Sequence, residues 1–369
     1  MNGMDELRAP PPIPHTDDAS ASSAPGHPST QLHLEDQATD LEDSNSIPDE
    51  SNTGVDKSGN ARAPPRTKKA RSLSELYIIC HLIFFSLLGT LARLGVQWLT
   101  FYPGAPITTS VLWANVGGSY IMGFLSEDRQ LFQLPASHQK PNMSTEDAKT
   151  QHSKYKKTIP LYIGLATGFC GSFTSFSSFI RDAFLALSND LPSPLFHPVP
   201  AGTPAPDFTH AHTRNGGYSV LAVLAVLIYE PGLSLCALNV GAHTALLLER
   251  TVPSISRRAN HLIDLLIIPL GLGTWLAAVL VAIFPSNTSW RGEVLFALVF
   301  APLGTLLRFY VSAKLNPRIK SFPLGTFAVN MFGTVILGMS YDLQRSRIGG
   351  IVGGSVAGCQ ILQGIEDGA

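Results

Sequence analysis

The segment Gly168–Phe179 places groups that could handle an ion inside an otherwise apolar run. It reads Gly-Phe-Cys-Gly-Ser-Phe-Thr-Ser-Phe-Ser-Ser-Phe, so glycines and hydroxyl groups interrupt a stretch long enough to cross a membrane. Backbone that leaves the helix at membrane depth survives only where it is buried in protein or lines a cavity. A helix break at Gly171–Thr174 would free backbone carbonyls that could bind a cation such as sodium.

Three phenylalanines, Phe173, Phe176 and Phe179, occupy every third position around and beyond this expected break. That spacing places them on roughly one face of a helix. An aromatic stripe of this kind is typical of packing between helices. The alternative is ion passage, because the edge of an aromatic ring is positive and can face a small anion. In that interpretation, serine and threonine hydroxyls donate hydrogen bonds to the same ion.

Two arginines and two asparagines recur in an internal repeat. The motif Gly-Thr-Leu-Ala-Arg that ends at Arg93 reappears as Gly-Thr-Leu-Leu-Arg ending at Arg308, and at the same offset Asn115 matches Asn330. Charged groups within a bilayer usually face protein or water. The arginines either extend to the membrane surface or attract anions to a vestibule. The asparagines either bond between helices or present their amide N–H groups to an anion.

A carboxylate lies inside a later apolar run, in the sequence Tyr229-Glu230-Pro231. An ionisable residue at such a position is a candidate proton-coupling site. The blander interpretation is that Glu230 lies in a kinked, wetted part of the helix, because proline interrupts helical hydrogen bonding. Both interpretations stay open from the sequence.

The composition that surrounds these residues is that of a membrane protein. The chain has 369 residues, of which 45% are hydrophobic and only 14% are charged, whereas soluble domains carry about 25% charged residues. Net charge is −1, so a basic excess for binding nucleic acid is lacking. The four cysteines all fall in apolar runs, which indicates neither disulfides nor a zinc site. No nucleophile–base pair or phosphate loop is apparent, and we expect no enzyme.

Apolar runs near the length that crosses a bilayer are separated by turn signals and charges. We expect an eighth run to begin near Gly349, and we interpret the polar stretches 126–158 and 188–216 as surface insertions. The seven complete runs are 77–101, 107–125, 159–187, 217–248, 262–284, 292–313 and 323–341.

Lysine and arginine predict the orientation of these spans. Five bases lie just before the first run, and bases are otherwise concentrated in alternate loops on the same side. The positive-inside rule then places the N-terminus in the cytoplasm. Residues 1–71 are acidic and rich in Pro and Ser, which is typical of a disordered tail.

The repeat and the number of spans together predict an inverted architecture. Four spans belong to the first copy, and the run 262–284 stands alone before the second copy, which therefore enters the membrane from the opposite side. Inverted repeats with a working site at their interface are typical of transporters. We expect an all-α integral membrane protein with a tail (1–71), a first repeat of four helices (72–250), a linker helix (251–285) and an incomplete second repeat (286–369).

The paired Gly-Thr-Leu-x-Arg and Asn-x-x-Gly motifs, with the segment Gly168–Phe179, resemble the CrcB/Fluc fluoride channel family. More narrowly, residues 77–369 resemble its eukaryotic two-domain fluoride export proteins, in which a linker helix joins two repeats. The resemblance implies a passive, selective fluoride channel that confers fluoride resistance. Its implied partners are the fluoride ion and the lipid bilayer, with the two repeats pairing within one chain.

The resemblance also implies roles for individual residues. An aromatic box, a pair of amides and a track of hydroxyls would line the ion pathway: Phe176, Phe179, Asn115, Asn330, Ser177 and Thr174. The backbone carbonyls of Gly171 and Thr174 would hold a structural sodium ion. Arg93 and Arg308 would lie towards the vestibule.

The second copy departs from the family pattern. Residues 364–369 match the approach to the break in copy one, so copy two is expected to be truncated in its third helix. This leaves two alternatives to a fluoride channel: a secondary transporter that uses Glu230 as its coupling carboxylate, or a non-conducting remnant or scaffold. Because fluoride accumulates in a near-neutral cytoplasm, an exit route is expected in the plasma membrane.

Overall fold

The computed structural model describes residues 68–102, 107, 109–133, 145–191, 216–284, 294–319, 321–345 and 356–368. All of them belong to one compact unit, Leu34–Ala369. The expected disordered tail falls outside the described residues up to position 67, and most of the stretch 188–216 falls outside them as well.

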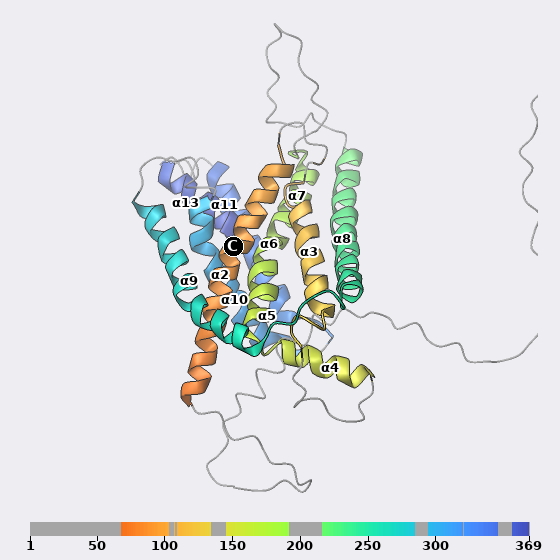
Figure 1. The fold of residues 1–369 in the computed structure, drawn as a ribbon. Coiled ribbons are helices and arrows are strands. Elements are labelled where there is room, and N and C mark those ends of the chain that lie inside the picture. Colours follow the sequence, from red (N-terminus) through yellow and green to blue (C-terminus); the bar gives the residue numbers. More distant parts are fainter. Residues whose placement is uncertain are drawn as a thin grey trace, which may run out of the picture. The chain divides into compact units, whose positions relative to one another are not determined.

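Throughout these described ranges the fold is helical, without a β-strand. Six helical segments are long and apolar enough to cross a membrane. The helices are α2 (Lys68–Thr100), α3 (Leu112–Glu127), α4 (Thr145–Lys156), α5 (Pro160–Ile163), η3 (Gly164–Phe169), α6 (Cys170–Phe173), α7 (Phe176–Ser188), α8 (Gly216–Leu247), α9 (Arg257–Ile283), α10 (Phe296–Leu315), η5 (Asn316–Arg318), α11 (Leu324–Arg345) and α13 (Val356–Gly368) (Figure 1).

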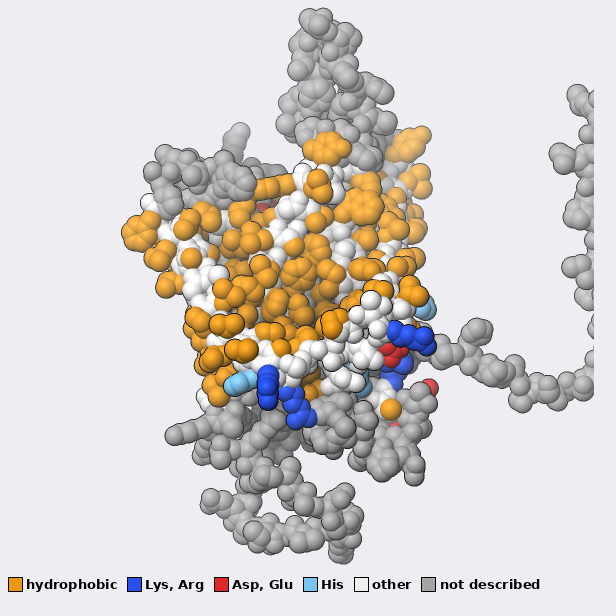
Figure 2. All heavy atoms as spheres, viewed as in Figure 1, with side chains coloured by type: hydrophobic (Ala, Val, Ile, Leu, Met, Phe, Trp, Pro, Cys, Tyr) orange, Lys and Arg blue, Asp and Glu red, His pale blue; other side chains and the backbone are white. Residues whose placement is uncertain are grey.

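The surface of the helices is apolar, as a lipid-facing surface requires. Figure 2 shows hydrophobic side chains covering one face of the protein, with Lys and Arg gathered near one end. On α8 and α9 many large apolar side chains are exposed, including Ile228 at 70% and Ile283 at 62%. These exposures would be costly in water and favourable in lipid.

The first repeat contains α2, α3, the broken third span and α8. Helices α3 and α8 cross so closely that a Cβ atom on Gly123 would collide with the backbone of Leu238, and one on Gly241 with the backbone of Tyr120. Small residues permit this approach between membrane helices. Helix α3 has 16 residues and begins five residues later than the expected start at 107. One cause is Ser110, whose backbone N–H donates to the Asp182 carboxylate instead of entering a helix.

The third span contains the expected break. Helices α5, η3 and α6 run continuously to Phe173, after which Thr174 and Ser175 are extended, with ψ values of 152° and 110°. Helix α7 then begins at Phe176. The break is centred on Thr174 and Ser175, towards the C-terminal end of the expected range, and Gly171 is still helical.

The linker helix α9 packs against both repeats. On the first repeat, the buried His81 of α2 lies 3.5 Å from the Asp264 carboxylate of α9. On the second, the Trp275 indole donates to the carbonyl of Val299 on α10 at 3.1 Å. Helix α9 is thus a packed structural element rather than a loose tether.

The second repeat supplies α10, α11 and α13, which pack on one another. Helix α10 also contacts α2, and α11 contacts α7. Helices of the two copies therefore pack against each other. The two Gly-Thr-Leu-x-Arg motifs lie on α2 and α10, which are in contact.

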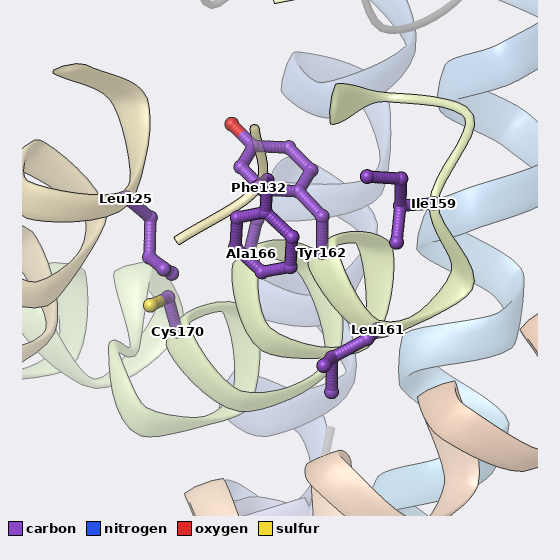
Figure 3. Packing of buried hydrophobic residues seen from close by; sticks show 7 residues of the cluster. All are labelled: Leu125, Phe132, Ile159, Leu161, Tyr162, Ala166 and Cys170. Carbon is purple, nitrogen blue, oxygen red and sulfur yellow. The ribbon is translucent and has the colours of Figure 1, made fainter. Parts of the chain in front are cut away.

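A buried cluster beside α4 corrects our interpretation of 126–158 as a surface insertion. The cluster is drawn in Figure 3 and joins the end of α3, the following turn and the third span: Leu125, Phe132, Ile159, Leu161, Tyr162, Ala166 and Cys170. The Phe132 and Tyr162 rings meet edge to face, with centroids 5.5 Å apart. The described part of this stretch is therefore integral to the first repeat.

Lys156, at the end of α4, secures this arrangement. Its ammonium group is buried and donates to the carbonyls of Leu125, Ser126 and Asp128 at 2.9, 2.7 and 2.9 Å. These carbonyls lie at the C-terminal end of α3, where helices lack internal donors. A cation there also complements the helix dipole.

We expect Lys156→Met to lower the free energy of unfolding by about 2 kcal/mol, because buried carbonyls lose their donor. The exposed neighbour Lys154 is the control, and Lys154→Met should melt with the wild type. Burial lowers the pKa of Lys156 from 10.5 to about 8. Between these values the unfolded chain holds a proton that the folded chain has released, so stability relative to Lys156→Met should rise with pH across that window. Equal melting temperatures for Lys156→Met and Lys154→Met would contradict a stabilising role of Lys156 at the end of α3.

Candidate functional site

A cavity of about 460 Å³ lies between the two repeats. Its walls come from α2, α6, the start of α7, α10, α11 and the end of α13. Seven of the nine expected site residues line it: Arg93, Gly171, Thr174, Phe176, Ser177, Arg308 and Asn330. Asn115 and Phe179 do not belong to this lining.

Asn115 instead braces the helix break. Its side-chain oxygen accepts from the backbone N–H of Ser175 at 2.8 Å, and its amide nitrogen donates to the Ser175 carbonyl at 3.4 Å. Both backbone groups of an extended residue are thereby bonded within the membrane, as the absence of water requires. The Ser175 hydroxyl in turn caps α7 by accepting from the N–H of Ser178. Asn115 therefore supports the backbone of the cavity wall without lining the cavity, whereas its counterpart Asn330 lines it.

The hydroxyl groups around the cavity link the two repeats and line its polar side. Ser172 and Thr305 share a hydrogen bond of 2.9 Å across the interface. Thr174 donates to the Cys170 carbonyl at 2.9 Å, and the Ser177 hydroxyl lies 3.3 Å from that of Ser175. Serine and threonine hydroxyls both donate and accept, so these groups could solvate a small ion.

The three phenylalanines of the motif have different surroundings. Phe173 is buried and its ring would touch a side chain added at Gly117. Phe176 lines the cavity and is 37% exposed, while Phe179 packs against the apolar cluster shared by α7 and α8. The Phe176 and Phe179 rings are nevertheless in edge contact, with centroids 5.9 Å apart. Phe176 is thus the ring of this pair that an ion in the cavity would meet.

The repeated arginines each reach the other repeat. Arg93 of α2, 3% exposed, donates to the backbone carbonyl of Asp367 on α13. Arg308 of α10 donates to the Gly171 carbonyl of α6 at 3.3 Å. Both guanidinium groups therefore bond to a third-helix carbonyl of the opposite copy, and both line the cavity.

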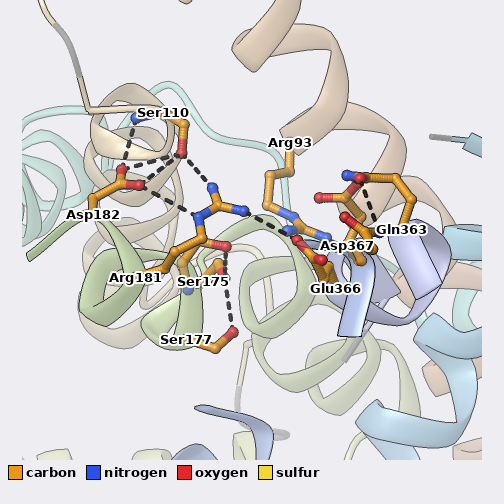
Figure 4. Close-up of polar contacts among 11 residues, drawn as sticks. Arg93, Ser110, Ser175, Ser177, Arg181, Asp182, Gln363, Glu366 and Asp367 are labelled. Carbon is orange, nitrogen blue, oxygen red and sulfur yellow. Dashed lines mark hydrogen bonds and ion pairs between the residues drawn. The ribbon is translucent and has the colours of Figure 1, made fainter. Parts of the chain in front are cut away.

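A polar network next to Arg93 was not foreseen from the sequence (Figure 4). Asp182 accepts from the backbone N–H of Ser110 at 2.8 Å, and Arg181 donates to the Ser110 hydroxyl at 2.9 Å. Arg181 also lies 3.7 Å from the Glu366 carboxylate of α13. The signal was present, because Arg181-Asp182 is a charged pair within an expected span. Only the fold brings it to Ser110 and Glu366.

Glu230 lies on α8 and its side chain is buried against neighbouring helices. It is 2% exposed, and its carboxylate accepts no hydrogen bond of good geometry. The side chains of Thr109 and Asn115 and the carboxylate of Asp182 lie close enough to interact with it. Helix α8 continues through Pro231 from Gly216 to Leu247, so the proline does not end the helix, and the role of Glu230 stays a prediction.

The residues at the break fit a sodium ion poorly. Of the two carbonyls expected to hold it, that of Gly171 already accepts the Arg308 guanidinium. A cation on the same oxygen would lie within about 6 Å of that positive charge, where repulsion is strong in a medium of low dielectric constant. We therefore assign sodium no role in the transport of the ion.

Comparison with known protein families matches residues 80–196 and 295–360 to the family described as CrcB-like protein, Camphor Resistance (CrcB). Fluoride export protein 1 of Candida albicans is 31% identical over 298 residues, which span 79% of this chain and 68% of that protein. The chain belongs to the CrcB family. The two matched segments cover parts of both repeats, and α8 and α9 fall between them.

Two further relatives are similar to this chain over a long and a short stretch. Fluoride export protein 1 of Neurospora crassa is 49% identical over 331 residues, covering 82% of this chain and 60% of that protein. The bacterial fluoride-specific ion channel FluC of Burkholderia lata is 35% identical over 57 residues, which cover 15% of this chain and 44% of that protein. The chain thus spans about three fifths of the length of the Neurospora relative. No solved structure matches it. With six candidate spans in the part of the chain that the structure describes, this CrcB protein is a multi-pass membrane protein.

Proposed function

We propose that this CrcB protein is a passive, selective fluoride channel that exports the ion from the cytoplasm, and not an enzyme. The observation that carries the proposal is the cavity between the two repeats, where arginines, hydroxyls and an amide converge. The names of its relatives, fluoride export proteins and a fluoride-specific channel, support the choice of ion.

Each group of the cavity has a physical role in this proposal. Arg93 and Arg308 supply positive charge that raises the local concentration of anions. The hydroxyls of Thr174 and Ser177 and the amide of Asn330 replace water around an ion that has shed its hydration shell. The Phe176 ring presents its positive edge to the same ion. Since none of these groups needs to change protonation state, transport can be passive.

The membrane and orientation are part of the proposal. Bases are concentrated just before and within the first turn of α2, and around α4, which favours a cytoplasmic N-terminus. A negative-inside potential would then drive the anion outward, which is useful where fluoride accumulates, at the plasma membrane.

The test is fluoride efflux from cells that lack their own exporter and express the full chain. Phe176→Ala should slow efflux by about tenfold, the factor that corresponds to the energy of one aromatic contact. Phe184→Ala is the matched control, because Phe184 lies on the same helix and is 59% exposed towards lipid. Equal effects of the two substitutions would contradict a pathway along Phe176.

A second arm separates the channel from a proton-coupled transporter. Glu230→Gln keeps the shape of the side chain and removes its titration. In a passive channel, efflux continues in Glu230→Gln and does not respond when the proton gradient is collapsed. Loss of gradient-driven transport in Glu230→Gln would favour the transporter instead.

A further inference from the structure

We propose that the Arg308 guanidinium is the fixed cation at the break of the third span, so that the chain needs no sodium ion there. This inference rests on the proposed function in one respect: a sodium ion at the break is expected only if the protein is a fluoride channel. It concerns a residue of α10 and a carbonyl of α6, and it can be tested without transport.

The break leaves the Gly171 carbonyl without its helical donor. In an uninterrupted helix that donor would be the N–H of Ser175, four residues later. Here the Ser175 N–H donates to Asn115 at 2.8 Å instead. A carbonyl without a donor is costly in a membrane, and the group that bonds it is Arg308, at 3.3 Å.

The position also favours a positive charge. Helical residues run without interruption from Pro160 to Phe173, so the break exposes the C-terminal, negative end of a helix dipole inside the membrane. Arg308 approaches closely enough that a Cβ atom added at Gly171 would lie 3.1 Å from its Nη1 atom. Glycine at this position thus admits the guanidinium to the helix end.

The first repeat supplies a related contact in the opposite direction. Arg93 occupies the position of Arg308 in its copy and donates to the carbonyl of Asp367, near the end of α13. Asp367 matches Thr167 of the first copy, one helical turn before Gly171, so the two arginines bond to different positions of the two third helices. A monovalent ion would have to displace Arg308 to gain the Gly171 oxygen.

The experiment is a thermal melt of the purified full chain in detergent, in sodium chloride or in N-methyl-D-glucamine chloride at about 0.15 M. The wild type should melt at the same temperature in both salts. Arg308→Met should melt about 4 °C lower in N-methyl-D-glucamine, because a buried carbonyl loses its donor. Sodium should restore part of that loss in Arg308→Met, since the site is then open to a cation. Arg318→Met, at an exposed position beyond α10, is the matched control and should match the wild type.

Three results would overturn the inference: a wild-type melting temperature that rises with sodium, an Arg308→Met variant no less stable than Arg318→Met, or an Arg308→Met variant on which sodium has no effect. Fluoride efflux measured on the same preparations separates this inference from the proposed function. A wild type that is insensitive to sodium and moves no fluoride refutes the channel and leaves the Arg308 assignment in place.

Discussion

Asn115→Ala should cost the protein about 2 kcal/mol of stability and most of its fluoride efflux. The amide holds both backbone groups of Ser175, and a buried N–H left without an acceptor costs about 1–3 kcal/mol. Without this brace, the extended conformation of Ser175 is no longer held, because the Gly171 carbonyl that would accept its N–H in a helix already accepts from Arg308. The cavity wall formed by Thr174–Ser177 would then be lost, so stability and transport should fall together.

Asn330→Ala is the matched control for this prediction, because Asn330 is the repeat counterpart and lies on α11. It leaves the Ser175 bonds in place, so we expect reduced efflux at nearly unchanged melting temperature. Thermal melts and efflux assays on both variants check this split. An Asn115→Ala protein as stable as the wild type would show that the brace does not hold the break.

Arg93→Met should be the most destabilising single change at the interface, by about 3 kcal/mol. Arg93 is 3% exposed and donates to the Asp367 carbonyl, and the Asp367 side chain is itself 8% exposed. Removing the guanidinium leaves a buried carbonyl without its donor and a buried carboxylate without its neighbouring cation. Removal of one partner from such a pair is costly because the other charge stays buried.

A double-mutant cycle checks the Arg93 prediction by denaturant unfolding. Adding Asp367→Asn to Arg93→Met should recover part of the loss, because the carboxylate no longer needs a counter-charge. Additive effects of the two substitutions would mean that the side chains do not interact. An Arg93→Met variant that unfolds with the wild type would remove Arg93 from the interface altogether.

The fold was largely predictable because membrane helices carry strong local signals. Among the described residues, six of the seven complete apolar runs are candidate spans, and the exception is 107–125, where α3 has only 16 residues. The glycines and hydroxyls of Gly168–Phe179 predicted the break to within a few residues. Helix α2, by contrast, begins at Lys68 and not near Tyr77, because basic residues are good helix formers that hydropathy does not detect. The first turns of α2 therefore contain part of the basic cluster expected before the span.

The partners of the site residues were not predictable, because they depend on how the helices cross. The sequence repeats Arg93 and Arg308 identically, yet nothing local indicates that each bonds to the opposite copy. Likewise, Asn115 and Asn330 share a motif position but only Asn330 lines the cavity. Lys156 counted in the sequence as one of several surface bases, and only the packing of α4 reveals its buried contacts.

The central claim, a fluoride pathway through the cavity between the repeats, is tested most directly with the purified full chain in liposomes. Vesicles loaded with potassium fluoride or potassium chloride are diluted into ion-free medium with a potassium ionophore, which carries the counter-ion, and efflux is followed with ion-selective electrodes. We expect fluoride efflux without a proton gradient, little chloride efflux, and slower fluoride efflux in Phe176→Ala than in Phe184→Ala. Fluoride efflux no faster than from protein-free liposomes, or equal rates for fluoride and chloride, would contradict a fluoride pathway through this cavity.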